Sequence, residues 1–247
     1  MVSSMLKGKT ILVTGGSGLI GSSVCDSIKE NGGRAISLDL EQSVSISCES
    51  LIVDCTDSSS LDYALFEAVK RYGVIHGAVH SAYPKTKHWG EKFGSIDYTR
   101  LSRDISMQLG SAILFSQVMH KYFLSKGDGS FVHLGSIQGI NAPKFEHYEC
   151  TSMTSPIEYS AVKAGVIAMT KWLAKYSFNS GIRFNCVSPG GVLDGQDKGF
   201  VERYRRACSS VGMLKSSDVS DTICFLLSDL SSRITGQNIV VDDGWTL

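Results

Sequence analysis

The sequence predicts an α/β protein, with a single domain in which helices flank a doubly wound, parallel sheet of seven strands. Two observations predict this fold. Short runs rich in β-branched residues alternate along the chain with longer segments whose apolar residues recur at helical spacing. Several of the short runs are apolar on both faces, as expected of strands that helices cover on both sides. The 247 residues show no internal repeat, low-complexity tract or linker, so we expect one domain over residues 1–247.

The candidate strands are short apolar or β-branched runs bounded by turn-forming residues. In chain order they are Thr10–Thr14, Ala35–Leu40, Leu51–Asp54, Ile75–Ser81, Phe131–Leu134, Arg183–Ser188 and Asn238–Val241. All four prolines, at positions 84, 143, 156 and 189, fall in the predicted connections. Because proline lacks a backbone N–H, this placement supports the division into elements.

Helical patterns separate these strands. Two apolar stripes mark the first two helices, at Ile20, Val24 and Ile28 and at Leu61, Leu65, Ala68 and Val69. Longer helices are predicted at about 97–125 and 158–177. Ser217 or Asp218 is expected to cap a last helix that runs through Leu227.

The composition is that of an ordinary globular protein, with 43% hydrophobic and 19% charged residues. Lys plus Arg equals Asp plus Glu at 24 each, so no net field attracts nucleic acid or an anionic membrane, and we expect neither as a partner. No apolar run is long enough for a signal peptide or a membrane span. The seven cysteines are odd in number and form no CxxC pair, which predicts free thiols in the cytoplasm and no metal site.

A glycine-rich segment, Thr14–Gly21, connects the first strand to the first helix and reads TGGSGLIG. It contains the pattern GxGxxG at Gly16, Gly18 and Gly21. Glycines allow the backbone to turn tightly and approach a pyrophosphate, and the last one lets the helix pack against the strand. The N–H groups and the positive end of that helix can then hold phosphates. With a strand before it and a helix after it, the motif predicts a dinucleotide site of Rossmann type.

An acidic residue follows at the expected distance. Asp39 lies at the end of the second predicted strand, 18 residues beyond Gly21. A carboxylate there accepts hydrogen bonds from ribose hydroxyls and repels a 2′-phosphate, which favours NAD over NADP. Asp54, at the end of the next strand, is expected to meet the adenine ring. The other expected cofactor-binding residues are Gly15, Ser17, Gly18, Leu19, Ile20, Gly21, Cys55, Ser81, Ala82, Tyr159, Lys163, Pro189, Gly190 and Val192.

Tyr159 and Lys163 form a YxxxK motif, in which residues one helical turn apart share a face of the helix. The same spacing occurs at Tyr83–Lys87 and Tyr122–Lys126, but only Tyr159 begins a long helix and follows a strand that ends near a candidate partner, Ser136. Lowering the pKa of a phenol from about 10 to about 7 requires roughly 4 kcal/mol. An ammonium about 6 Å away gives roughly 2–3 kcal/mol at an effective dielectric constant near 20. We therefore expect Lys163 and an oxidised nicotinamide to lower the pKa of Tyr159 together, against the effect of burial.

With these residues the chain resembles the short-chain dehydrogenase/reductase family over nearly its whole length. The matching motifs are the TGGSGLIG loop, Asp39, Asp54, Ala82 of HSAY, Ser136, Tyr159, Lys163, Ser188-Pro189-Gly190, Ile234-Thr235-Gly236-Gln237 and Asp243-Gly244. The resemblance implies that Tyr159 is the general acid/base and that Ser136 binds the reacting oxygen. It also implies that Lys163 lowers the pKa of Tyr159 and holds the nicotinamide ribose. Pairing through the two long helices is implied as well, in a homodimer or a homotetramer.

The chain departs from the usual pattern of the compact branch of this family. Its glycines at 15, 18 and 21 follow the TGxxGxxG spacing of the extended branch, and the 22 residues between Ser136 and Tyr159 exceed the usual interval. Only 84 residues follow Lys163, which leaves no room for the extended branch's C-terminal substrate domain. We therefore assign the chain to the compact branch, with an enlarged active-site loop at about 138–158. Polar side chains in that loop suit a hydroxyl-rich substrate, and the loop could act as a lid.

Two further motifs are altered. The family's NNAG after the fourth strand reads His80-Ser81-Ala82-Tyr83 here. The helix Asn that completes the catalytic set is replaced by Gln108, or by Ser106 if the helix is aligned differently, and we include Gln108 among the predicted catalytic residues. The proton relay that the family runs through this position is therefore open to question.

The segments HSAYPKTK, APKFEHYE, SPxEYSAxK and NIVVDDGWTL resemble a narrower subgroup, the bacterial oxidoreductases associated with flagellin and surface-glycan sugar pathways around nonulosonic-acid synthesis. The leading hypothesis is hydride transfer between NAD and a secondary alcohol or ketone of a polar, sugar-related substrate. One alternative is a sugar epimerase or dehydratase that recycles its NAD internally, which the glycine spacing favours. Another is a non-catalytic NAD-binding protein, which the altered HSAY and helix-Asn positions favour.

Overall fold

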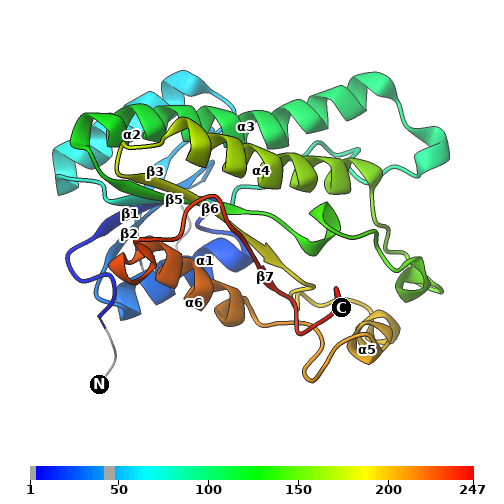
Figure 1. Ribbon diagram of the computed structural model, residues 1–247. Coiled ribbons are helices and arrows are strands. Elements are labelled where there is room, and N and C mark those ends of the chain that lie inside the picture. The colour runs from blue at the N-terminus through cyan, green and yellow to red at the C-terminus, as the bar shows by residue number, and fades with distance from the viewer. Residues whose placement is uncertain (1–3, 42–47) are drawn as a thin grey trace.

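The computed structural model describes residues 4–41 and 48–247, which form one parallel sheet of seven strands (Figure 1). The strands are β1 (Thr10–Thr14), β2 (Arg34–Asp39), β3 (Glu49–Ile52), β4 (Gly77–His80), β5 (Gly129–Leu134), β6 (Ile182–Pro189) and β7 (Asn238–Val241). Their order in the sheet is β3-β2-β1-β4-β5-β6-β7, and every pairing is parallel. The strand order reverses between β1 and β4, and in such sheets the ligand crevice lies at the carboxyl ends on either side of this point. The predicted doubly wound fold is confirmed.

Helices cover both faces of the sheet. Figure 1 shows α1 (Leu19–Glu30) and α6 (Ser216–Leu227) on one face, with α2 (Ser58–Tyr72), α3 (Tyr98–Lys126) and α4 (Ile157–Tyr176) on the other. A short helix, α5 (Lys198–Arg206), lies near the C-terminus beyond the sheet. Single 3₁₀ turns occur at Phe93–Ser95, Ile137–Gly139, Phe145–Tyr148 and Asp229–Ser231.

The core consists of two apolar layers, one on each side of the sheet. Successive side chains of β1 point to opposite faces, so Ile11 and Val13 pack with α1 and α6 while Leu12 packs with α2 and α3. Phe115 and Phe123 of α3 are fully buried in the second layer. Each such side chain contributes roughly 1.5–3 kcal/mol through its burial. The central strands β1, β4 and β5 are buried along their whole length, whereas the edge strands β3 and β7 are partly exposed.

Several predicted boundaries shift. β3 begins and ends two residues early, because it pairs with β2 from Ile36↔Glu49 to Asp39↔Ile52, and Asp54 therefore lies beyond the strand. β4 is shorter than predicted at both ends. Pro189 is not in a connection but is the last residue of β6. It is tolerated there because the next N–H, that of Gly190, makes the bond to the carbonyl of Val241 at 2.8 Å.

The helix α5 was not predicted, and one predicted helix cap is wrong. Only Phe200 and Tyr204 of α5 are buried, so the helix carries too short an apolar stripe to be recognised from periodicity. In α6 neither Ser217 nor Asp218 is the cap residue. The helix begins at Ser216, and the Asp218 carboxylate accepts the Lys215 backbone N–H at 2.8 Å from within the first turn.

Within these residues we find no helix with the length and apolar character that crossing a bilayer requires.

Candidate active site

A cavity of about 990 Å³ opens at the carboxyl ends of the strands. One part of its wall is the β1–α1 loop with the end of β2, and another is formed by Ser136, Tyr159 and Lys163. The remaining wall comes from the segment after β4, the loop before α4, the segment after β6, α5 and Trp245. The topology thus brings the predicted glycine loop and the predicted catalytic residues into one crevice.

The glycine loop is shaped by close backbone contacts. Gly15 has a left-handed φ of 66°, and a Cβ at this residue would lie 2.7 Å from the Cα of Ala82. A Cβ at Gly21 would overlap the Gly15 carbonyl oxygen, so only glycine lets α1 begin this close to β1. Position 18 is less restricted in side-chain size, because a Cβ added at Gly18 would lie 3.3 Å from that same oxygen.

The first turn of α1 fits a bound phosphate. The cap residue Gly18 offers no side-chain hydrogen bond, and no acidic residue lies in the first turn. The N–H groups and the positive end of the helix therefore face the cavity without a capping side chain of their own. Asp39 adjoins them, since its carboxylate accepts the Ser17 N–H at 2.9 Å and the Leu40 N–H at 3.0 Å. A carboxylate held in this way keeps further lone pairs for ribose hydroxyls, so these residues fit a dinucleotide.

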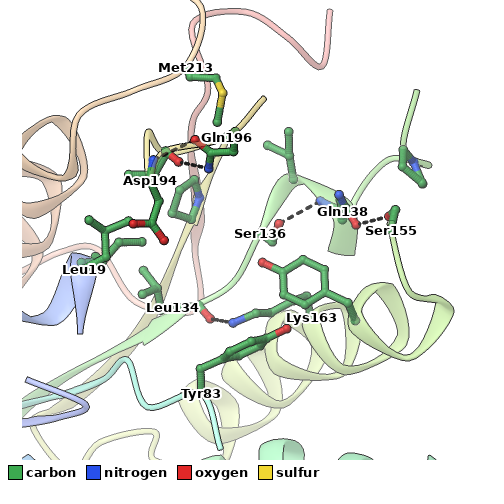
Figure 2. Close-up of a pocket in the computed structure, with 18 of the residues that line it drawn as sticks. Leu19, Tyr83, Leu134, Ser136, Gln138, Ser155, Lys163, Asp194, Gln196 and Met213 are labelled. Carbon is green, nitrogen blue, oxygen red and sulfur yellow. Dashed lines mark hydrogen bonds between the residues drawn. The ribbon is translucent and has the colours of Figure 1, made fainter. Parts of the chain in front are cut away.

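Ser136, Tyr159 and Lys163 come together at the end of β5 and the start of α4. The Ser136 hydroxyl accepts the Gln138 N–H at 3.2 Å and is close enough to the Tyr159 phenol to lower the pKa of that phenol. The Lys163 ammonium donates to the carbonyl oxygen of Leu134 at 2.8 Å and lies 5.7 Å from the centroid of the Tyr159 ring. Figure 2 shows Ser136 and Lys163 on the same side of the pocket, with Tyr83 beside them.

Burial sets the protonation of this pair. It raises the pKa of Tyr159, and the nearby Ser136 hydroxyl only partly opposes that rise. Burial also lowers the pKa of Lys163 to about 8. In this arrangement the phenol is therefore a protonated acid at neutral pH, and the ammonium alone does not outweigh the desolvation of the phenolate.

Two aromatic residues that the sequence analysis did not select enclose the pair. The rings of Tyr83 and Trp89 meet the Tyr159 ring edge-on, at centroid distances of 5.9 and 6.5 Å. The Lys163 ammonium is 5.8 Å from the centroid of the Tyr83 ring, so it lies close to two aromatic rings. One signal was available, since Tyr83 stands where the family motif ends in glycine. Nothing in the sequence pattern indicated Trp89.

Gln108 lies behind this wall rather than in the cavity lining. It is buried in α3, and its amide is close enough to the Tyr83 phenol to lower the pKa of that phenol, which burial raises more strongly. Neither amide atom reaches a partner with hydrogen-bond geometry among the described residues. Ser106, the other candidate for this position, is exposed. Of the two residues, Gln108 is the one connected to the catalytic group, because it lies close to Tyr83 and Tyr83 contacts Tyr159.

Most of the predicted cofactor-binding residues line the cavity, namely Gly15, Ser17, Gly18, Leu19, Ile20, Gly21, Asp39, Ser81, Tyr159, Lys163, Pro189, Gly190 and Val192. Asp54, Cys55 and Ala82 do not. The Asp54 carboxylate accepts the backbone N–H and the hydroxyl of Thr56, and burial raises the pKa of the Cys55 thiol to about 11. Ala82 lies against Gly15 and supports the loop from behind. Contact of these three residues with a cofactor stays a prediction.

The loop at 138–158 is tied down at several points. The Gln138 side chain donates to the Tyr148 hydroxyl at 3.2 Å and accepts from the Ser155 hydroxyl at 2.8 Å. Arg203 of α5 donates to the carbonyl oxygens of His147 and Glu149, at 3.1 and 2.6 Å. These bonds fix the loop as part of the cavity wall.

In the described part of the chain, no group of three or more His, Cys, Asp and Glu side chains is placed to hold an ion. All seven cysteines are free thiols. Cys150 is exposed in the enlarged loop and lies outside the cavity lining.

Comparison with known proteins agrees with this geometry. A family model described as enoyl-(acyl carrier protein) reductase matches residues 20–246. The post-translational flagellin modification protein A of Campylobacter coli is 42% identical over 256 residues, covering 98% of this chain and 100% of that protein. The 7alpha-hydroxysteroid dehydrogenase of Bacteroides fragilis is 27% identical, covering 97% of this chain and 95% of that one.

Solved structures agree as well. A short chain dehydrogenase from Leptospira borgpetersenii with bound NAD+ superposes with a TM-score of 0.90 at 30% identity, covering 99% of this chain and 95% of that one. The aldohexose dehydrogenase of Thermoplasma acidophilum has the same fold, with a TM-score of 0.84 at 22% identity over 100% of this chain and 96% of that one.

Proposed function

The chain belongs to the short-chain dehydrogenase/reductase family, and on that premise we propose that it transfers a hydride between NAD and a secondary alcohol or ketone of a polar, sugar-derived substrate. The family consists of dehydrogenases and reductases that act on hydroxyl or keto groups. The observation that carries the proposal is that Ser136, Tyr159 and Lys163 share one cavity with the glycine loop.

The cofactor half of the cavity supports NAD. When bound, the nicotinamide ring supplies or accepts the hydride. The uncapped first turn of α1 is suited to the pyrophosphate, and the Asp39 carboxylate to ribose hydroxyls. No Lys or Arg occurs between Arg34 and Lys70, so this part of the chain offers no cation to balance a 2′-phosphate next to Asp39. The Leptospira structure holds NAD+.

The catalytic residues then act on the substrate oxygen. In the reductive direction the protonated Tyr159 phenol donates its proton to the carbonyl oxygen as the hydride arrives at carbon, and in the oxidative direction it takes the proton back. Ser136 donates a hydrogen bond to the same oxygen while negative charge develops there. The Lys163 ammonium stabilises the phenolate that proton donation leaves behind, which burial alone would disfavour.

A sugar-derived substrate is supported by two observations. The name of the Campylobacter coli relative connects that protein with flagellin modification, which agrees with the resemblance of the sequence to flagellin-associated oxidoreductases. The cavity wall also includes polar groups of the enlarged loop, among them Gln138, Thr154 and Ser155. We infer a sugar on the surface-glycan route as the substrate class.

The proposal is tested with Tyr159→Phe, which removes the acidic proton and keeps the ring. Against a panel of sugars with NAD or NADH, we expect turnover to fall by about 10³-fold, within the range for loss of a general acid/base, while NAD binding stays nearly intact. Tyr98→Phe, an exposed residue outside the cavity, is the matched control. Unchanged turnover in Tyr159→Phe would remove the assignment. Product without net NADH would indicate internal recycling, and NAD binding without turnover of any sugar would favour the non-catalytic alternative.

We also infer a homo-oligomer that forms through α3 and α4. Large apolar side chains are exposed on both helices, including Ile113 and Leu124 on α3 and Trp172 on α4. Trp172 stacks on Tyr176 at a centroid distance of 4.8 Å, which makes a flat apolar surface. Light scattering after gel filtration distinguishes a monomer, a dimer and a tetramer, and we expect Trp172→Ser to weaken the assembly while Leu230→Ser, exposed outside these helices, does not.

We further infer that the protein works in the cytoplasm. Its seven cysteines are free thiols, and Cys25, Cys186 and Cys224 are buried, as suits a reducing compartment. Cell fractionation with an antibody against the chain checks this location.

A further inference from the structure

Charged groups that line the cavity are unevenly distributed. The two carboxylates belong to the cofactor half: Asp39 bonds the glycine loop, and Figure 2 shows Asp194 beside Leu19, across the pocket from Ser136 and Lys163. Apart from Lys163, the lining cations are Lys85 and Lys144, which come from the segment after β4 and from the enlarged loop. The part of the wall built from these two segments contains no lining carboxylate.

Lys144 is held in place by neutral groups. Its ammonium donates to the carbonyl oxygen of Trp245 at 3.2 Å and lies 4.5 Å from the centroid of the Trp245 ring. Trp245 is itself fixed, being 3% exposed and stacked on Tyr204 with an interplanar angle of 17°. An ammonium has three donors, and the Trp245 carbonyl occupies one. Lys144 is therefore a preorganised cation that can still donate to a ligand.

Neither Lys144 nor Lys85 has an ionic partner, since among the described residues no carboxylate oxygen lies within 4.0 Å of either ammonium. Glu146, two residues beyond Lys144 in the enlarged loop, is exposed, and the two carboxylates that precede Trp245 in the chain accept bonds from other donors. Asp242 accepts the N–H groups of Gly244 and Thr246, and Asp243 accepts those of Ser210 and Gly212.

Lys85 is placed less firmly. It is exposed, and its ammonium lies 5.7 Å from the centroid of the Tyr83 ring, which lines the cavity next to the catalytic tyrosine. It can therefore approach a substrate that contacts Tyr83, but it lacks the fixed geometry of Lys144.

We propose that Lys144, assisted by Lys85, binds an anionic substituent of the substrate, and hence that the substrate is an acidic sugar carrying a phosphate or a carboxylate. This inference rests on the proposed function, because it assigns the substrate class of the same site. Hydrogen bonds to a charged group in a partly desolvated cavity raise the affinity for an acidic ligand over a neutral one by about 10- to 100-fold. If Lys144 only tied the enlarged loop to the C-terminal segment, its substitution would weaken the binding of acidic and neutral ligands equally.

The experiment measures binding and not turnover. NAD-loaded Tyr159→Phe protein is titrated with glucose, glucose 6-phosphate and glucuronate by calorimetry, so that the two acidic probes separate phosphate from carboxylate. We expect at least one acidic sugar to bind about 10-fold or more tightly than glucose, and this preference to weaken as ionic strength rises. Because the variant lacks the proton donor, a failure of the hydride-transfer proposal leaves this binding result unaffected.

Substitutions then assign the preference to Lys144. Lys144→Met in the same background should abolish it while leaving glucose binding unchanged, and Lys144→Arg should retain part of it. Lys7→Met, an exposed charge removal before β1 and outside the cavity lining, is the matched control and should change nothing. If Lys144→Met does not fold, Lys144→Arg and the comparison of acidic sugars with glucose in the Tyr159→Phe protein still test the proposal. The proposal is overturned if no acidic sugar binds more tightly than glucose, or if Lys144→Met weakens all three sugars alike.

Discussion

The two halves of the cavity are built in different ways. The cofactor half is built mainly from the β1–α1 loop and the end of β2, and it acts through backbone N–H groups, a helix end and the carboxylate of Asp39. The substrate half comes from segments far apart in the chain, and it acts through side chains such as Tyr83, Lys144 and Trp245. Backbone recognition needs only a short local sequence, whereas side-chain recognition depends on how distant segments pack. The two halves should therefore respond differently to mutation.

Lys163 is where the halves meet, and its loss should have the largest effect. Lys163→Met removes the charge that stabilises the Tyr159 phenolate, so we expect kcat to fall by about 10³-fold. Because burial lowers the pKa of Lys163 to about 8, the charged ammonium costs the folded state free energy at neutral pH. We therefore expect the Tm of the variant at neutral pH to equal or exceed that of the parent protein, measured by thermal melts.

The pH dependence checks this explanation. The unfolded lysine titrates near 10.5 and the folded one at about 8, so between these values the unfolded chain binds more protons and the parent protein gains stability as pH rises. The variant lacks this gain, and its advantage in Tm should shrink from about pH 8 upward. Lys175→Met, which removes a charge from the same helix outside the cavity, should show no such trend. A gap in Tm that widens with pH would contradict the assigned burial.

Gly21→Ala tests the cofactor half alone. The added Cβ would overlap the Gly15 carbonyl oxygen, which is backbone and cannot move aside cheaply. We expect a loss of stability of about 2–3 kcal/mol and at least a 30-fold weaker Kd for NAD, since overpacking costs typically 1–3 kcal/mol and the phosphate loop is displaced. Chemical denaturation and NAD titration measure the two effects.

Gly110→Ala is the matched control, because its Cβ would meet nothing closer than the Ser106 hydroxyl at 3.8 Å. Alanine in a helix interior is favoured over glycine by about 1 kcal/mol, so this variant should be slightly more stable than the parent protein. If the two substitutions had similar effects, the steric explanation of the glycine loop would be wrong.

The same difference between the halves explains what the sequence predicted. The fold and the glycine loop could be predicted because strand patterns, Gly21 and Asp39 act locally, and Tyr159 and Lys163 because one helix turn joins them. The roles of Trp89, Trp245 and α5 could not be predicted, because they depend on contacts between segments that no local pattern connects. Asp54 was predicted at a strand end and lies beyond β3, since an edge strand is bounded by its pairing and not by its apolar run.

Asp39→Asn tests cofactor choice and should have a smaller effect. The amide oxygen can still accept the Ser17 N–H, but the negative charge that repels a 2′-phosphate is gone. We expect the ratio of kcat/KM for NAD to that for NADP to fall by about 10-fold, equivalent to about 1.4 kcal/mol. Asp62→Asn, an exposed charge removal on α2, should leave the ratio unchanged. An unaltered ratio in Asp39→Asn would mean that another group determines cofactor choice.

Tyr83 should have the smallest effect, and it shows whether the substrate half tunes the acid/base pair. Tyr83→Ala removes a ring that lies 5.9 Å from Tyr159 and 5.8 Å from the Lys163 ammonium. Aromatic and cation–π contacts at a partly exposed site contribute about 0.5–1 kcal/mol, so kcat should fall by about 2- to 5-fold. Tyr83→Phe keeps the ring and should change kcat by less than about 3-fold, because only the hydroxyl near Gln108 is lost.

The pH profile separates this tuning from simple loss of packing. Removing the ring admits water to Lys163, which relieves the burial that lowers the pKa of this lysine to about 8. The pH above which kcat declines should therefore move upward in Tyr83→Ala and stay in place in Tyr83→Phe and in Tyr63→Ala, an exposed control on α2. If the decline in Tyr83→Ala moved downward or stayed fixed, the aromatic wall would serve only to shape the cavity. An upward shift would mean that a residue of the substrate half sets the working pH of a pair that the sequence already predicted.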